Sequence, residues 1–380
     1  MRVRLGDYIK EYSVKNKNNE DIPVYSVSNS LGFCKDYFGK EVASKNKTTY
    51  KIVPRGCFAY NPSRINVGSV DWQNEEERVI VSPLYNVFSV SPLLDQQYLL
   101  YYLKSNMTLA RIKAVASGSV RDNLKLSMLY EFPIDLISLD QQYEVVSILN
   151  AIQKIIDLYQ KELSGLDELV RARFVEMFGD PNIEFKYNSV KFNDLAARMT
   201  KGPFGSDMKK DLFVPKGEDT YKVYIQINAI QKNQSLGEYY ISKEYFDRKV
   251  SRFELFPNDY IITCDGTLGK YLKLDENMEK GVISPSLLRL TLQNDKINDK
   301  YFENIWDFYM LGLMKKEARN ACLVHLPSAK KIGEISIPLP PLELQNQFAS
   351  FVEEVDKSRL QEQLSIKYTM KLLEEMNSPH

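Results

Sequence analysis

Residues 139–181 read LDQQYEVVSILNAIQKIIDLYQKELSGLDELVRARFVEMFGDP, and this stretch decides the fold of the chain. Its apolar residues recur with three-four spacing, which defines a heptad seam along one long helix. The helix is expected to end near Phe178, because Gly179 suits a left-handed C-cap and Pro181 prevents continuation. The seam residues are Leu149, Ile152, Ile156, Tyr159, Leu163, Leu166 and Val170.

A second long helix is predicted from about Glu343 to Met376. Its seam opens with Phe348, Val352 and Val355 and closes with Ile366, Met370 and Leu373; the polar run 356–359 interrupts it. One such stripe alone would be typical of an amphipathic helix packed on a domain core. Two long helices, each following a globular segment, favour antiparallel pairing about a pseudo-twofold axis.

An internal repeat connects the two halves of the chain. The run Val3–Ile9 is echoed by Val190–Ala196, an offset of 187, and the first helix start matches the second at an offset of 203. Ser82-Pro83 likewise matches Ser284-Pro285. The second copy is therefore longer by about fifteen residues, and each copy is too long for a solenoid repeat.

The segments before each helix have a mixed α and β composition. Residues 222–227, 259–263 and 287–292 are β-rich, whereas residues 95–109 and 301–318 have helical patterns. The fold class is therefore expected to be α+β. Two similar mixed α/β domains, residues 1–138 and 183–337, are separated by two long helices, residues 139–182 and 338–380, that form an antiparallel coiled coil.

The charge of the chain is segregated by segment. The 380 residues have a formal net charge of zero, which alone argues against a nucleic-acid binder. Lys and Arg nevertheless outnumber Asp and Glu by 18 to 14 in residues 1–138 and by 24 to 21 in residues 183–337. The ratios are 4 to 8 in residues 139–182 and 4 to 7 in residues 338–380. Mildly basic domains thus alternate with acidic helices.

The sequence gives no support for a membrane protein or a metal-binding protein. No run approaches 18 apolar residues and the start MRVRLGDYIK lacks the apolar core of a signal peptide, so a cytoplasmic location is expected. The four cysteines, Cys34, Cys57, Cys264 and Cys322, form no CxxC pair and are expected to be buried or idle thiols. The only histidines are His325, expected to be structural, and His380.

No catalytic motif is visible either. The chain lacks GxGxxG and GxxxxGK[ST] loops, which bind dinucleotides and nucleoside triphosphates. Asn61-Pro62-Ser63-Arg64 lacks the second proline and the aromatic residue of a base-modifying Asn-Pro-Pro-aromatic motif. We therefore predict no catalytic residues, no metal site and no cofactor bound by this chain.

Two glycine-containing loops offer groups suited to DNA. Residues 201–210 contain three lysines, and residues 60–69 contain two asparagines and an arginine. Asn or Gln can pair bidentately with adenine and Arg or Lys with guanine, while lysines contact phosphates. Composition alone would also fit solvated turns.

The ordered motifs of both halves resemble the specificity subunits of Type I restriction-modification systems, over essentially the whole chain. In the first half these motifs are residues 23–28, 50–56, 58–64 and 81–85; in the second they are residues 202–206, 256–261 and 265–269. Residues 337–345, IPLPPLELQ, are similar to the family's entry into a conserved helix, whereas residues 134–142 lack the paired prolines.

The resemblance implies that each domain is a target recognition domain reading one half of a bipartite double-stranded DNA target. The helices would set the gap and dock two methyltransferase subunits, which carry S-adenosylmethionine. Motor-nuclease subunits, which use ATP with Mg²⁺, would complete the complex. This chain would then be a non-catalytic recognition subunit.

The residues expected to contact DNA come from several loops. They are Ser28, Asn29, Tyr60, Asn61, Ser63, Arg64 and Asn66 in the first domain, and Lys201, Ser206, Lys209, Lys210, Gln226, Asn228 and Thr267 in the second. Two alternatives stay open: a coiled-coil protein scaffold that binds no DNA, and a fragment of a fused restriction-methylation enzyme. The sequence specifies neither the target bases nor the spacer length.

Overall fold

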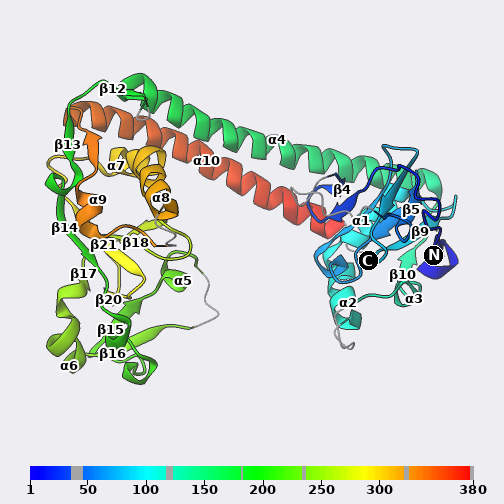
Figure 1. Cartoon of the computed structure of the whole chain (residues 1–380), viewed down its shortest axis with the longest axis horizontal. Helices are drawn as coiled ribbons and strands as arrows, with labels where there is room; N and C mark the ends of the chain where they lie inside the picture. The colour runs from blue at the N-terminus through cyan, green and yellow to red at the C-terminus, as the bar shows by residue number, and fades with distance from the viewer. Residues whose placement is uncertain (36–45, 117–122, 181–182, 233–236, 321–324, 377–380) are drawn as a thin grey trace. The chain divides into compact units, whose positions relative to one another are not determined.

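A computed structural model describes residues 1–35, 46–116, 123–180, 183–232, 237–320 and 325–376 (Figure 1). The predicted stop at Pro181, together with Cys322 and His380, lies outside these residues. The chain divides into two compact units, each combining one mixed α/β domain with part of both long helices. Unit 1 comprises Met1–Glu162 and Glu362–His380, and unit 2 comprises Leu163–Gln361.

The domain of unit 1 is built on a four-stranded antiparallel sheet in the order β2-β9-β6-β7. Phe58 of β6 stacks on Phe88 of β9 with ring centroids 5.0 Å apart, and both are fully buried. The strands of unit 1 are β1 (Arg2–Arg4), β2 (Ile9–Glu11), β3 (Ser26–Ser28), β4 (Gly32–Cys34), β5 (Lys51–Pro54), β6 (Phe58–Tyr60), β7 (Val70–Trp72), β8 (Arg78–Val81), β9 (Asn86–Val90) and β10 (Pro133–Asp135). The helices are η1 (Leu5–Asp7), η2 (Ile65–Val67), α1 (Gln96–Lys104), α2 (Asn106–Ala116) and α3 (Leu126–Leu129).

The domain of unit 2 contains two four-stranded sheets, β14-β21-β18-β19 and β16-β15-β20-β17, in which β15 and β20 are parallel. Its strands are β11 (Gly179–Asp180), β12 (Glu184–Phe185), β13 (Ser189–Lys191), β14 (Ala196–Lys201), β15 (Thr220–Tyr224), β16 (Tyr239–Ser242), β17 (Glu254–Leu255), β18 (Tyr260–Thr263), β19 (Tyr271–Lys273), β20 (Gly281–Ile283), β21 (Leu287–Leu292) and β22 (Ser336–Pro338). Its helices are η3 (Phe192–Asp194), η4 (Gly205–Asp207), η5 (Lys210–Leu212), α5 (Gln226–Ala229), α6 (Lys243–Tyr245), η6 (Phe246–Val250), η7 (Ser251–Phe253), α7 (Asp299–Ile305), η8 (Trp306–Met310), α8 (Leu311–Asn320) and α9 (Ala329–Gly333).

The predicted repeat is confirmed element by element. The series β1, η1, β2 corresponds to β13, η3, β14, and in both units its first strand pairs with the strand that precedes a long helix. The sheet order β2-β9-β6-β7 corresponds to β14-β21-β18-β19. Leu5 and Phe192, which hold equivalent places in the two series, are both fully buried. The α+β class is confirmed as well.

Both long helices have the predicted bounds. Helix α4 spans Leu139–Phe178 and helix α10 spans Leu342–Met376. Gly179 follows α4 with a φ of +91°, in the left-handed region that favours glycine. A Cβ at this position would lie 2.5 Å from the carbonyl oxygen of Glu184, so only glycine fits the turn. The compact units do not coincide with the four predicted segments, because the division passes through both helices.

Within unit 2 the two helices are antiparallel and share one core with the domain. Phe174 of α4 contacts Phe348 of α10 with ring centroids 5.5 Å apart, and Arg359 of α10 donates to Asp167 of α4 at 2.7 Å. Residue numbers therefore rise along α4 as they fall along α10. The predicted seam residues of α4 are all buried or half-buried, but Met370 of α10 is 47% exposed and lies off the seam.

Three of the predicted local elements needed correction or refinement. Residues 222–227 do not form one strand, because β15 ends at Tyr224 and α5 begins at Gln226. The predicted helix 95–109 is broken at Ser105, whose backbone is extended and whose Oγ accepts from the Thr108 amide at 3.2 Å. The predicted helix 301–318 is continuous but contains the π-turn η8.

Cys57 and Cys264 are buried and Cys34 is half-buried, and all three are free thiols. Of the helices in the described ranges, none combines the length and the apolar character needed to cross a membrane.

Candidate nucleic-acid interface

The first group of predicted residues lies on two adjacent turns of unit 1. The turn between β3 and β4 carries Ser28 and Asn29, and the loop after β6 carries Asn61, Ser63 and Arg64. The two turns meet, since Asn29 Oδ1 lies 2.6 Å from the position that a Cβ would occupy on Gly68. The hairpin is also tied to β7, because Asp71 Oδ2 accepts from the Phe33 amide at 3.0 Å.

Internal hydrogen bonds give the loop after β6 its shape. Asn61 Oδ1 accepts from the Ser63 amide at 3.1 Å and from the Ser63 hydroxyl at 2.9 Å. The Asn61 carbonyl accepts from the amides of Arg64 and Ile65 at 3.0 and 2.9 Å. These bonds fix the backbone and leave the Ser63 and Arg64 side chains exposed. Asn66 is half-buried in the same loop.

Two residues of this domain that were predicted to contact DNA, Tyr60 and Ser28, have side chains that face the interior. Tyr60 is fully buried, and its hydroxyl donates to the Leu124 carbonyl at 3.1 Å and accepts from Asn86 Nδ2 at 2.9 Å. Burial raises the pKa of this hydroxyl. Ser28 is 4% exposed, and its Oγ accepts from the Leu31 amide at 2.9 Å. A side chain without exposed surface cannot touch a duplex, so the choice of Tyr60 is corrected: it is a core residue.

In unit 2 the turn at Ser284–Ser286 gathers three loops. The Tyr224 carbonyl, just before Gln226, accepts from the Ser284 amide at 3.0 Å, and the Ser286 carbonyl accepts from the Cys264 amide at 2.8 Å. Gly202 packs so closely that a Cβ there would lie 2.0 Å from the Ser284 carbonyl oxygen. The turn that matches Ser82-Pro83 in the sequence repeat is therefore the hub of this site.

The side chains at the hub come from the three gathered loops. Gln226 Nε2 donates to Thr267 Oγ1 at 2.9 Å, although 41 positions separate these residues. Lys201, the last residue of β14, is exposed and close enough to Cys264 to oppose the rise that burial causes in the pKa of that thiol, which reaches about 12. The hub thus combines a half-buried amide, an exposed hydroxyl and an exposed cation.

The loop after Gly202 presents further cations. Ser206, Lys209 and Lys210 are exposed. Between them, the Asp207 carbonyl accepts from the Tyr245 hydroxyl at 3.0 Å, and Asp207 Oδ1 lies 3.5 Å from Lys249 Nζ. The loop is therefore pinned at its centre, while its lysines face solvent.

Asn228 lies on α5, two residues after Gln226. Its Nδ2 donates to the Gly237 carbonyl, whereas its Oδ1 is buried and has no hydrogen-bond partner in the described part of the chain. Asn228 as a whole is half-buried. The bond to Gly237 occupies the Nδ2 group of Asn228, and the choice of this residue as a DNA contact stays a prediction.

One pair at the hub was missed from the sequence. His325 Nδ1 lies 2.5 Å from Asp265 Oδ1, and the two residues form an isolated β-bridge. The Leu326 amide also donates to the Cys264 carbonyl at 2.8 Å. The partners are 60 positions apart in the sequence, which explains why no local pattern indicates the pair. His325 thus holds the segment that carries Thr267, in addition to offering a ring nitrogen to the surface.

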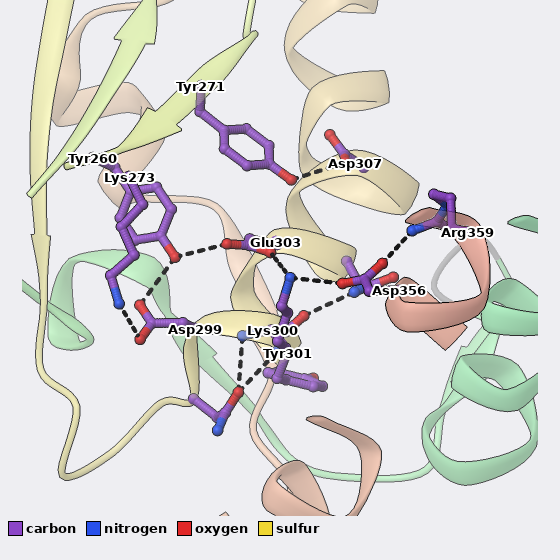
Figure 2. Close-up of polar contacts among 12 residues, drawn as sticks. Tyr260, Tyr271, Lys273, Asp299, Lys300, Tyr301, Glu303, Asp307, Asp356 and Arg359 are labelled. Carbon is purple, nitrogen blue, oxygen red and sulfur yellow. Dashed lines mark hydrogen bonds and ion pairs between the residues drawn. The ribbon is translucent and has the colours of Figure 1, made fainter. Parts of the chain in front are cut away.

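A polar network joins the domain of unit 2 to helix α10 (Figure 2). It surrounds a cavity of about 430 Å³ between α4, α7, η8 and α10. Lys300 and Arg359 face several carboxylates there, and burial is the first cause of the raised pKa of Asp307. Within the described ranges, no group of three or more His, Cys, Asp or Glu side chains could hold a metal ion.

The family model described as "Type I restriction modification DNA specificity domain" matches residues 4–168 and 204–367. The specificity subunit of the Type I restriction enzyme MjaVIII from Methanocaldococcus jannaschii is 31% identical over 144 residues, which are 34% of this chain. The match spans only 32% of that subunit's length.

Two solved structures share the fold at 13% sequence identity. One is a chain from a study of complex assembly and conformational transition of the type I R-M system, with a TM-score of 0.61 over 99% of this chain and 96% of the other. The second is the S subunit of a Type I restriction-modification system from M. genitalium, with a TM-score of 0.50 over 100% and 96%.

Proposed function

Because the chain belongs to the Type I restriction-modification DNA specificity family, we propose that each of its two domains reads one half of a bipartite double-stranded DNA target. The observation that carries the proposal is the hub in unit 2. There Gln226, Thr267 and Lys201 come from three separate loops and are held by one turn. A Gln amide restrained by a neighbour loses less freedom on pairing with a base edge, and lysines suit phosphates.

The first domain would read the other half with a smaller set. Asn29, Ser63 and Arg64 are exposed on two turns that meet, and Arg64 can pair bidentately with guanine. The two sets differ in chemistry because the domains are divergent copies of one module. An asymmetric target is therefore expected.

We further propose that the long helices dock methyltransferase subunits. In unit 1 their segments carry exposed apolar side chains, and Tyr368 is 70% exposed. Exposed apolar surface of this kind marks protein interaction sites. S-adenosylmethionine, and ATP with Mg²⁺, would be bound by partner subunits, so this chain would supply recognition and assembly without catalysis. The apolar positions are Tyr143, Ile148, Ile155, Leu158, Leu364, Tyr368, Met370, Leu372 and Met376.

Selection from a pool of random DNA duplexes tests the DNA proposal, with the full chain alone and with its methyltransferase partner. The wild type should enrich a split sequence. Gln226→Ala should change the enriched bases of one half only, and Arg64→Ala those of the other. Lys357→Ala, an exposed position on α10, serves as the control and should change neither half. Enrichment of no sequence by the complex would overturn the proposal and favour a scaffold that binds no DNA.

Co-purification tests the docking proposal separately. Tyr368→Glu with Leu364→Glu should reduce capture of the methyltransferase subunit, because charges replace apolar contacts. Gln347→Glu, at an exposed position near the start of α10, should leave capture unchanged. Equal capture by both variants would place the docking surface elsewhere.

A further inference from the structure

The hairpin β18–β19 connects the hub to helix α7. Its loop carries Asp265 and Thr267. At its base, Tyr260 and Lys273 are paired across the two strands, and both contact Asp299 of α7. The Tyr260 hydroxyl lies 2.9 Å from Asp299 Oδ1, and Lys273 Nζ lies 2.7 Å from Asp299 Oδ2 (Figure 2). Movement of α7 would therefore carry the hub loop with it.

The other end of the hairpin loop is tied to the same helical segment. Trp306 Nε1 donates to the Gly269 carbonyl at 2.9 Å, and the Tyr271 hydroxyl donates to Asp307 Oδ2 at 3.1 Å. Trp306 is fully buried, so this contact is well defined. The segment from α7 to η8 thus holds both sides of the loop.

Ion pairs continue from α7 to the long helices. Lys300 Nζ lies 3.0 Å from Asp356 Oδ2 of α10 and 3.2 Å from Glu303 Oε2. Arg359 bonds Asp356 and also donates to Asp167 of α4 at 2.7 Å. Burial lowers the pKa of Lys300, but the carboxylates of Glu303 and Asp356 outweigh it and the pKa is raised overall. Lys300 therefore stays charged in this setting.

The ion pair between Lys300 and Asp356 is partly shielded from solvent. The Lys300 and Asp356 side chains are each 33% exposed. Partly buried pairs are screened by salt less than fully exposed ones. In unit 1, by contrast, the corresponding contact from α1 to α4 joins neutral groups, with the Tyr101 hydroxyl donating to Asn150 Oδ1 at 2.7 Å. At this contact, therefore, a neutral hydrogen bond in unit 1 stands where unit 2 has an ion pair.

We propose that Lys300, which bridges Asp356 and Glu303, is a positioning residue. It fixes the orientation of the second recognition domain relative to helices α4 and α10. It thereby narrows the range of spacer lengths that the subunit accepts. This inference rests on the proposed DNA function. If the domain changes its orientation, the hub moves relative to the helices. The distance between the bases that the two domains read then changes as well.

The experiment measures spacer preference in duplexes that carry the two half-sites found by random selection, separated by spacers of varied length. The probes are these duplexes, bound to the full chain with its methyltransferase partner. For the wild type we expect the best spacer to be preferred over its neighbours by about tenfold, a usual scale for one misplaced contact. In Lys300→Met the preference should fall to about threefold, while the bases selected in each half stay the same.

Conservative and control variants separate charge from packing. Lys300→Arg keeps the bridge to both carboxylates and should restore the wild-type preference, whereas Lys357→Met on α10 should have no effect. Unchanged spacer preference in Lys300→Met, or equal broadening in Lys300→Arg, would overturn the inference while leaving DNA reading intact. Failure of the wild type to select a split target would instead overturn the proposed function.

A second variant covers the case in which Lys300→Met does not fold. Arg359→Met removes the contacts to Asp356 and Asp167 from the same network. It should broaden the spacer preference in the same direction with a thermal unfolding midpoint close to that of the wild type. A normal preference in a folded Arg359→Met chain would count against the network as the positioning device.

Discussion

Gln142 and Gln345 make the same three hydrogen bonds at equivalent places in the two halves of the chain. Each is fully buried in the first turn of its long helix. Each accepts at 2.8 Å from the backbone amide of the residue that caps a domain helix, Asp95 for Gln142 and Asn298 for Gln345. Each also donates to two carbonyl groups. These are Leu93 and Ile137 for Gln142, and Lys296 and Pro340 for Gln345.

Removal of one of these amides should destabilise the fold strongly. Gln345→Ala would leave one buried amide and two carbonyl groups unpaired, so the free energy of unfolding should fall by about 2–4 kcal/mol. Urea unfolding followed by circular dichroism measures the change. Gln347→Ala, an exposed neighbour on the same helix, should stay within about 0.5 kcal/mol of the wild type. Similar losses in both variants would show that the hydrogen bonds do not matter.

The aromatic core at the start of α10 gives a second prediction. Phe174 is fully buried and stacks on Tyr301 at 5.7 Å, with Phe348 and Phe308 at its edges. Phe174→Ala should lower the free energy of unfolding of unit 2 by about 3–5 kcal/mol through lost burial and a residual cavity. Phe204→Ala, at a 76% exposed position, provides the matched control and should leave the midpoint unchanged.

The salt dependence of DNA binding should show whether the lysines of the loop after Gly202 contact phosphates. Because each phosphate contact contributes about 0.9 to the slope of log K against log salt concentration, Lys209→Ala with Lys210→Ala should reduce that slope by up to about 2. Affinity should fall for all sequences to a similar degree. Fluorescence anisotropy at several salt concentrations gives the slope. A variant with the wild-type slope would remove these lysines from the interface.

A carboxylate just before strand β20 of unit 2, that of Glu279, should make stability depend on pH. Bonds from Lys216, and then those of Lys222, hold the pKa of Glu279 below its usual value of 4.5, against the effect of burial. Its contribution is therefore present above pH 4.5 and is lost as the pH falls through the lowered value. Glu279→Gln should melt at a lower temperature than the wild type at pH 7, and the difference between the two melting temperatures should shrink as the pH falls from 4.5 through the lowered pKa. A constant difference across this range would contradict the assignment.

Local patterns predicted the long helices well because the signals act within a few residues. The end of α4 at Phe178 follows from Gly179, whose left-handed backbone no other residue would adopt cheaply. The strand 259–263 and the strand 287–292 were also predicted to within a residue. Gln226 was predicted to lie in a strand because the preceding residues, Tyr224 and Ile225, favour β-structure. Its contact with Thr267 depends on tertiary structure, which no local pattern indicates.

The interface was predicted less completely than the fold. The loops that carry Arg64, Lys209 and Thr267 were chosen for their residue types and glycines, and the structure leaves these residues exposed, as a DNA contact requires. The choice of Tyr60 as a DNA contact was wrong because Tyr60 is the last residue of strand β6. This strand pairs with β9 on one side and β7 on the other, and all of its residues are buried. The Asp265–His325 pair had no local signal, since it depends on a bridge between distant segments.

The division of the long helices has a consequence for synthesis on the ribosome. Unit 2 is one continuous segment, whereas unit 1 draws on residues 362–376 as well as on the first 162. Met376 lines the same small cavity as Tyr98 and Leu149, so one wall of unit 1 is made last. Domains generally fold in the order in which they emerge. Here the first domain to emerge is the last to be finished, and its nascent helix keeps an uncovered apolar side until the second domain has left the ribosome.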